Sequence, residues 1–126
     1  MPTALIIEDN ENNLYMMRFI LAKLGYAVLE ARDGAAGVEM AKAHRPDLIL
    51  MDIQLPVLDG YAATRRIRQD DALKAVPIIA VTSYAMVGDK EKALAAGCTA
   101  YVEKPINPPA FIKVLERFRQ AGGETP

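Results

Sequence analysis

The residues of this sequence that could do chemistry share one position, directly after a short apolar run. They are Glu8 and Asp9, Asp52, Thr82 and Ser83, and Lys104. A continuous apolar run such as Leu48–Met51 is typical of a strand buried on both faces of a sheet. Because the carboxyl ends of parallel strands share one edge, we expect carboxylates, hydroxyls and an ammonium group to meet there.

Carboxylates gathered at one edge favour a hard divalent cation. Like charges repel at short range, so ionising Glu8, Asp9 and Asp52 together requires a cation to offset them. Oxygen ligands and an open, water-keeping site suit Mg²⁺. The sequence has one Cys and one His, which offers no zinc or transition-metal site. We therefore expect Mg²⁺ as the cofactor.

A carboxylate beside Mg²⁺ can act as a nucleophile toward phosphorus and form an acyl phosphate. The transferred phosphoryl group carries charge on three equatorial oxygens. Mg²⁺ would take one oxygen, the Lys104 ammonium a second, and the Thr82 hydroxyl with nearby backbone N–H groups the third. Two simpler interpretations stay open: an ion-pair network at the strand ends, and an Asp52 that only anchors its loop.

Alternating strands and helices must position these residues. The expected strands are Ala4–Ile7, Tyr26–Ala31, Leu48–Met51, Val76–Val81 and Cys98–Glu103. Helical periodicity and stop signals such as Gly25 predict helices between them. The expected helices are about 12–24, 35–43, 61–69 and 88–96, and a last one after Asn107 with Phe111, Val114, Leu115 and Phe118 as its buried stripe.

This alternation predicts an α/β fold, a doubly wound (βα)₅ three-layer sandwich with a parallel five-stranded sheet. Residues 1–126 are expected to form a single domain, with a core of about 4–120 and a loose C-terminal tail at 121–126.

The composition restricts location and partners. A net charge of −1 without a Lys/Arg cluster gives no basis for direct nucleic-acid binding. Apolar runs such as Val76–Val81 are too short to span a membrane, and we recognise no signal peptide. The single cysteine, Cys98, rules out an internal disulfide and fits a reducing cytoplasm, which is the expected location.

From residue 4 to about residue 120 the chain resembles the receiver domain of two-component response regulators. The matching motifs are Glu8-Asp9-Asn10, Leu50-Met-Asp-Ile-Gln-Leu-Pro56 with Asp59-Gly60, Val81-Thr82-Ser83, Tyr101 and Lys104-Pro105. Together, and in this order, the motifs are highly specific. The resemblance implies a flavodoxin-like fold with strand order 2-1-3-4-5 and a phosphorylation-operated signalling switch in a phosphorelay.

The resemblance implies that Asp52 is phosphorylated from a sensor histidine kinase or a histidine phosphotransfer protein. Asp9, Asp52 and the backbone carbonyl of Gln54 would bind Mg²⁺. Glu8 stands where the family more often has aspartate, and it would reach the ion directly or through water. The protein would not be an enzyme in the usual sense, since it would catalyse only its own phosphorylation and dephosphorylation.

The same resemblance implies a conformational switch made by Thr82 and Tyr101. On phosphorylation the Thr82 hydroxyl would move toward the phosphoryl oxygens, and the Tyr101 ring would turn inward. The peptide bond before Pro105 would be cis and would direct Lys104 at Asp52. The output would be a contact with a downstream protein through the fourth helix, fifth strand and fifth helix.

Two further positions are expected to set the lifetime of the acyl phosphate, Gln54 and Tyr84. Each lies two residues after a residue of the site, Asp52 or Thr82, and both should border the path of the attacking water. A bulky Tyr84 could obstruct that water, and Gln54 could orient it. We predict that changing either one alters the dephosphorylation rate.

Other polar and aromatic residues are assigned structural roles. His44 is expected at a helix end and Cys98 as a buried thiol. Tyr15, Met16, Met17, Phe111 and Phe118 are expected to be core and helix-packing residues, and Arg65, Arg66 and Arg68 a solvated helix face.

Three alternative assignments fit parts of this pattern. An aspartate-nucleophile phosphohydrolase should have a second acid where this chain has Gln54, and a flavodoxin-type FMN binder should have a phosphate loop where Glu8-Asp9-Asn10 would repel phosphate. A receiver module cut from a hybrid histidine kinase or a larger regulator stays open, although the ends modestly favour a free-standing protein.

Overall fold

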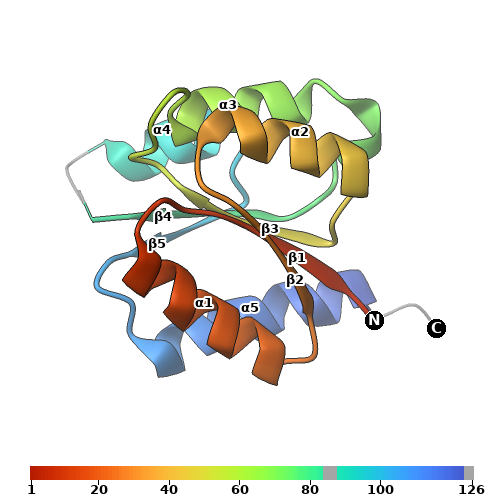
Figure 1. The fold of residues 1–126 in the computed structure, drawn as a ribbon, viewed down its shortest axis with the longest axis vertical. Coiled ribbons are helices and arrows are strands. Elements are labelled where there is room, and N and C mark those ends of the chain that lie inside the picture. Colours follow the sequence, from red (N-terminus) through yellow and green to blue (C-terminus); the bar gives the residue numbers. More distant parts are fainter. Residues whose placement is uncertain (84–87, 124–126) are drawn as a thin grey trace.

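The computed structural model describes residues 1–83 and 88–123. Its strands are β1 (Thr3–Ile7), β2 (Ala27–Ala31), β3 (Leu48–Asp52), β4 (Ile78–Thr82) and β5 (Ala100–Glu103). Its helices are α1 (Glu11–Lys23), α2 (Gly34–His44), α3 (Gly60–Arg68), α4 (Asp89–Ala96) and α5 (Pro108–Gly123), with a short 3₁₀ helix, η1 (Asp71–Leu73). The strands are parallel and pair in the order β2-β1-β3-β4-β5, which confirms the expected fold (Figure 1).

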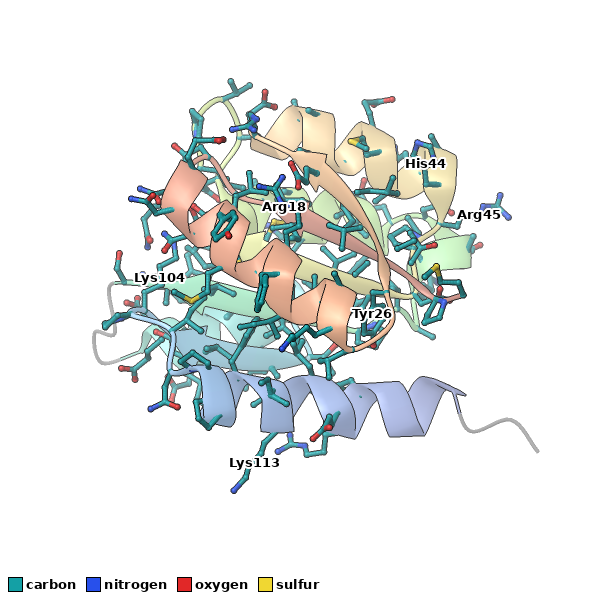
Figure 2. The ribbon with its side chains drawn as sticks, turned by 60° about the horizontal axis from the view of Figure 1, so that its bottom comes forward. Arg18, Tyr26, His44, Arg45, Lys104 and Lys113 are labelled. Carbon is teal, nitrogen blue, oxygen red and sulfur yellow. The ribbon has the colours of Figure 1, made fainter. Side chains whose placement is uncertain are left out.

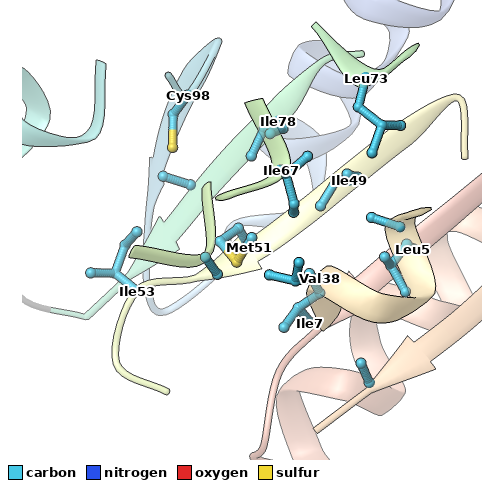
Figure 3. Packing of buried hydrophobic residues seen from close by; sticks show 14 of the residues in the cluster. Leu5, Ile7, Val38, Ile49, Met51, Ile53, Ile67, Leu73, Ile78 and Cys98 are labelled. Carbon is cyan, nitrogen blue, oxygen red and sulfur yellow. The ribbon is translucent and has the colours of Figure 1, made fainter. Parts of the chain in front are cut away.

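Helices cover both faces of the sheet, with α1 and α5 on one face and α2, α3 and α4 on the other (Figure 1). The central strands are buried on both faces, and alternate residues point to opposite sides. On β1, Leu5 and Ile7 pack with the α2–α3–α4 layer, while Ala4 and Ile6 pack with the α1–α5 layer. Figure 3 shows the first of these clusters, where Ile49 and Met51 of β3 also lie.

Side-chain caps define where three of the helices begin. Asn10, Asp33 and Asp59 precede α1, α2 and α3, and each side chain accepts a hydrogen bond from the backbone N–H three residues later. These caps satisfy donors that the first helical turn leaves unpaired. They also terminate the loops after β1, β2 and β3, so each helix starts close to the carboxyl edge of the sheet.

Three strands begin later than expected, and for β2 the difference is a single residue, since it starts at Ala27 instead of Tyr26. Val76 was predicted to start the fourth strand, but its carbonyl accepts a hydrogen bond from Arg68 Nη1 at 2.6 Å, and β4 starts at Ile78. Pro77 has no N–H to donate to a ladder. Cys98 was predicted to start the fifth strand, but its N–H donates to the carbonyl of Ala93 in the last turn of α4, and β5 starts at Ala100.

The predicted solvated role of Arg68 is wrong. Its guanidinium donates to the carbonyls of Leu73, Val76 and Gly97, among others, at 2.6 to 2.9 Å. Burial lowers the pKa of Arg68 from its usual value. The other two arginines of the predicted face, Arg65 and Arg66, are exposed as expected.

The predicted core role of Tyr15 is also wrong, since its side chain is 63% exposed. It lies on the outer side of α1, where the Arg18 guanidinium stands 5.9 Å from the ring centre. The helical period explains the difference: Leu14 and Met17 occupy the buried stripe, and Tyr15 falls outside it. The other aromatic and thiol assignments agree with the structure, with Phe111 and Cys98 buried.

Among residues 1–83 and 88–123, no helix has the length and apolar character needed to cross a membrane.

Candidate active site at the carboxyl edge of the sheet

Strand register brings the acidic residues together. Ile7 of β1 pairs with Met51 of β3. The residues that follow them, Glu8 and Asp52, therefore lie side by side. Asp9 follows at the start of the loop. One carboxylate oxygen of each of these three acids lies within 4.8 Å of the others. The predicted convergence of acids from the amino end and the middle of the chain is therefore present.

Lys104 joins the acids from β5. Its backbone N–H donates to the carbonyl of Thr82 at 2.8 Å, which aligns the end of β5 with the end of β4. The Lys104–Pro105 peptide bond is cis. The Lys104 Nζ atom lies 3.0 Å from Glu8 Oε1 and 3.3 Å from Asp52 Oδ1. Figure 2 shows Lys104 at the end of the molecule opposite to His44 and Arg45.

Asp52 is 3% exposed and has a raised pKa of about 7. Burial is the largest cause, because it penalises the charged carboxylate, and the neighbouring Glu8 carboxylate raises the pKa further. Lys104 and the Gln54 N–H, which donates to Asp52 Oδ1 at 3.2 Å, act in the opposite direction. One lysine thus compensates only part of the charge that the acids bring.

The donor set fits a hard divalent cation. Glu8 is completely buried, and its Oε1 atom has no hydrogen-bond partner among the described residues, although Lys104 Nζ is close enough for an ion pair. The single ammonium group of Lys104 contacts both Glu8 and Asp52, and one positive charge does not offset the three clustered carboxylates. The three carboxylates lie in one cleft of about 600 Å³, lined by Glu8, Asp9, Asn10, Asn13, Asp52, Gln54, Ser83, Lys104 and Pro105. Oxygen ligands with room for water are what Mg²⁺ prefers.

Thr82, the last residue of β4, is buried beside the cleft. The side-chain amide of Gln54 donates to the Thr82 hydroxyl oxygen, and Gln54 Nε2 and Thr82 Oγ1 are 2.6 Å apart. Sequence reasoning assigned both residues to the site but missed this contact. No sequence signal specifies this contact, because it depends on the pairing of Asp52 with Val81, which places the residues after β3 beside the end of β4.

The loop after Asp52 is tightly built. Leu58 N–H donates to the Pro56 carbonyl at 2.7 Å, which closes a turn around Val57. Val57 has a φ of 71°, a conformation that costs energy for a β-branched residue. A side chain at Gly60 would have its Cβ 2.4 Å from the Asp52 carbonyl oxygen, so only glycine lets α3 start this close to the site.

The other residues predicted for the site are Tyr101, Tyr84 and Ser83. Tyr101 lies on β5, half-buried against the α2–α3–α4 side of the core. Burial and the nearby Asp89 carboxylate raise its pKa. Tyr84 lies outside the described residues. Ser83 is exposed at the rim of the cleft.

Residues 4–116 match the sequence model of one protein family, the response regulator receiver domain. Among similar proteins, the polar-differentiation response regulator DivK of Brucella anthropi is 43% identical over 116 residues, which cover 92% of this chain and 94% of DivK. DivK of Brucella ovis is 41% identical over 116 residues, with the same coverage of both chains.

Solved structures with the same fold include receiver domains. The receiver domain of the sensor histidine kinase PA1611 from Pseudomonas aeruginosa PAO1, with a magnesium ion coordinated in its active site cleft, is 43% identical. Its TM-score is 0.85, and the alignment covers 93% of this chain and 96% of that one. The chemotaxis protein CheY4 of Vibrio cholerae is 30% identical, with a TM-score of 0.87 and coverage of 94% and 98%.

Proposed function

This chain belongs to the response regulator receiver domain family, and we propose that it accepts a phosphoryl group on Asp52 and passes the signal on by protein–protein contact. The observation that carries the proposal is the position of Lys104 Nζ, 3.3 Å from Asp52 Oδ1, at a cleft that also holds Glu8 and Asp9. The same residues meet the needs of phosphoryl transfer, which are a nucleophile, a cation and a metal-binding acid pair.

The proposed reaction is a displacement at phosphorus. A carboxylate oxygen of Asp52 forms a bond to the phosphorus of a phosphohistidine, and the bond from phosphorus to the imidazole nitrogen breaks. The imidazole nitrogen keeps the electron pair and takes up a proton. Lys104 neutralises charge on the phosphoryl oxygens, and the Thr82 hydroxyl donates to another of them.

We propose Mg²⁺ as the cofactor, held by Asp9, Asp52, Glu8 and the backbone carbonyl of Gln54. When bound, it would offset the carboxylate charges and the charge of the phosphoryl group. Support comes from the oxygen-only donor set, the clustered carboxylates whose charge Lys104 offsets only in part, and the magnesium ion in the PA1611 receiver domain. Glu8 could bind the ion directly or through a water molecule. Its contact with Lys104 favours binding through water.

Membership of the family supports a proposal for the partners and the location. We propose a sensor histidine kinase or a histidine phosphotransfer protein as the donor, and a downstream protein that binds the face made by α4, β5 and α5. Tyr101 lies on β5, the strand of that face, and its ring would turn inward when the Thr82 hydroxyl moves toward the phosphoryl group. We further propose that the protein works in the cytoplasm, where its phosphodonors would be found.

An origin within a larger kinase remains the alternative. The PA1611 receiver domain, a part of a sensor histidine kinase, shares 43% identity with this chain, as does the response regulator DivK of Brucella anthropi. In a hybrid kinase, Asp52 would receive its phosphoryl group from the same polypeptide and pass it to a histidine phosphotransfer protein. An immunoblot of a native cell extract distinguishes the two roles: a band near 13.8 kDa supports a free-standing regulator, and a much larger band supports a receiver module within a kinase.

The direct test is intact mass spectrometry after incubation with acetyl phosphate. We expect one added phosphoryl group in the presence of Mg²⁺, and none when EDTA removes the metal. Asp52→Asn should remove the modification, because the amide is not a nucleophile toward phosphorus. A matched control, Asp71→Asn, changes an exposed acid on η1 and should be phosphorylated normally. Normal phosphorylation of Asp52→Asn would contradict the proposal.

The dephosphorylation rate gives a second test. Gln54 borders the cleft, and Tyr84 was predicted to border the path of water. We expect Gln54→Ala and Tyr84→Ala to change the half-life of the phosphorylated protein, measured by the loss of the added mass. Unchanged half-lives in both variants would remove the assignment.

A further inference from the structure

The hydrogen bond between Gln54 and Thr82 joins the two strand ends that flank the cleft. Gln54 Nε2 and Thr82 Oγ1 are 2.6 Å apart, and the Gln54 backbone N–H donates to Asp52 Oδ1 at 3.2 Å. We propose that Gln54 is a positioning residue that holds the Thr82 hydroxyl in its resting place. This hydrogen bond must therefore break before the Thr82 hydroxyl can donate to a phosphoryl group on Asp52. This inference rests on the proposed function.

The direction of the bond decides what Gln54 controls. An amide N–H can only donate, so it engages the oxygen of the Thr82 hydroxyl and not its proton. A phosphoryl oxygen, by contrast, requires that proton. Gln54 therefore does not compete for the proton, but it restrains where the oxygen that carries the proton lies. A threonine side chain changes place by moving between staggered rotamers, and such a movement carries the oxygen away from the amide.

Burial makes this restraint effective. Thr82 is 2% exposed, so water has little access to replace a lost hydrogen bond at its hydroxyl. A hydrogen bond within a folded protein contributes a net stabilisation that corresponds to about two- to tenfold in an equilibrium constant. The resting arrangement of Thr82 should be favoured by a factor of that size relative to the arrangement that contacts a phosphoryl group.

The arrangement also separates the roles of the Gln54 backbone and side chain. The backbone N–H contacts Asp52, and the carbonyl is the proposed metal ligand, while only the side chain reaches Thr82. A substitution of the side chain removes the Thr82 contact and keeps the backbone groups. Methionine is a suitable replacement, because it is unbranched and of similar length but donates no hydrogen bond.

The test measures affinity for beryllofluoride, a phosphoryl analogue, in the presence of Mg²⁺ by titration calorimetry. The analogue reports the Thr82 rearrangement without hydrolysis, so an effect on the attacking water does not enter. We expect Gln54→Met to bind beryllofluoride about two- to tenfold more tightly than the unaltered chain. Gln69→Met, the same change at an exposed residue after α3, should leave the affinity unchanged.

A double-mutant cycle distinguishes positioning from a general structural effect. In a Thr82→Val background, which lacks the hydroxyl, Gln54→Met should change the affinity by a factor near one. Equal or weaker binding by Gln54→Met, or an undiminished effect in the Thr82→Val background, overturns the proposal. Should Gln54→Met not fold, Gln54→Ala takes its place. Failure of the unaltered chain to bind beryllofluoride at all would count against the proposed function itself.

Discussion

Asp52 is a buried carboxylate next to a second buried carboxylate, Glu8, and both contact the same lysine. Burial and the Glu8 charge raise the pKa of Asp52 to about 7, while Lys104 opposes them only in part. A nucleophile must be ionised, and here ionisation is unfavourable unless further positive charge is present. The residue that would do the chemistry therefore depends on a cation for its reactive state.

The raised pKa of Asp52 predicts how stability depends on pH in metal-free protein. The unfolded chain releases this proton near pH 4 and the folded chain near pH 7, so within that window the folded state binds more protons. The contribution of Asp52 is thus present below pH 4 and is lost as pH rises toward 7. The free energy of unfolding should fall by up to about 1.4 kcal/mol per pH unit from this group.

Urea unfolding in EDTA at pH 5, 6 and 7 measures this contribution as a difference between the unaltered chain and Asp52→Asn. Taking the difference cancels the acids that do not interact with Asp52, including Glu11, whose pKa is lowered by Arg32. The variant should gain stability relative to the unaltered chain as pH rises. A difference independent of pH would contradict the assigned pKa.

At the scale of elements, Arg68 links three segments that the chain connects only indirectly. It ends α3 and donates to Leu73 and Val76 before β4, and to Gly97 in the turn between α4 and β5. The Thr99 hydroxyl oxygen accepts hydrogen bonds from Arg68 and from the backbone N–H of Ile78 at the start of β4. These bonds hold the amino ends of β4 and β5, whose carboxyl ends supply Thr82 and Lys104 to the site.

Arg68→Lys should therefore destabilise the protein although it preserves the charge. A lysine ammonium cannot match the planar, multiply donating guanidinium, and carbonyls at Leu73, Val76 or Gly97 would lose partners. We expect a loss of about 2 kcal/mol in the free energy of unfolding, measured by urea denaturation. Arg66→Lys, on the same helix but exposed, should cost less than about 0.5 kcal/mol. Equal effects of the two substitutions would be inconsistent with the role of Arg68.

At the scale of the whole molecule, the site joins segments from the start, the middle and the end of the chain. Asp9 follows β1, Asp52 ends β3 and Lys104 follows β5, and each lies at the carboxyl edge of one sheet. A ligand at this edge would contact elements that come together only in the folded state. Binding there should therefore stabilise the whole fold.

Mg²⁺ should raise the melting temperature because the unfolded chain does not assemble the three acids. At a concentration one hundred times the dissociation constant, the added stability is about 2.7 kcal/mol. Asp9→Asn should remove most of this gain in thermal unfolding with and without Mg²⁺. Asp71→Asn, far from the cleft, should keep it. A gain that persists in Asp9→Asn would place the ion elsewhere.

Much of the fold could be predicted because its signals are local. Continuous apolar runs such as Leu48–Met51 identified the buried strands, and stop signals such as Gly25 identified the ends of helices. One error arose where a distant segment intervenes, at Val76, and another arose within a single helix, at Tyr15. Val76 resembles a strand residue, but Arg68 engages its carbonyl, and Tyr15 resembles a packing residue, but it falls outside the buried stripe of α1.

The order of residue types along this chain by itself determined the alternating fold and the set of polar residues at the strand ends. It did so because hydrophobic periodicity and strand direction are properties of short segments. Only the tertiary structure decided that Lys104 lies between Glu8 and Asp52, and that the Gln54 amide reaches the Thr82 hydroxyl. Such contacts depend on the register between strands and on the rotamers of buried side chains, and both are set by packing among residues far apart in the sequence.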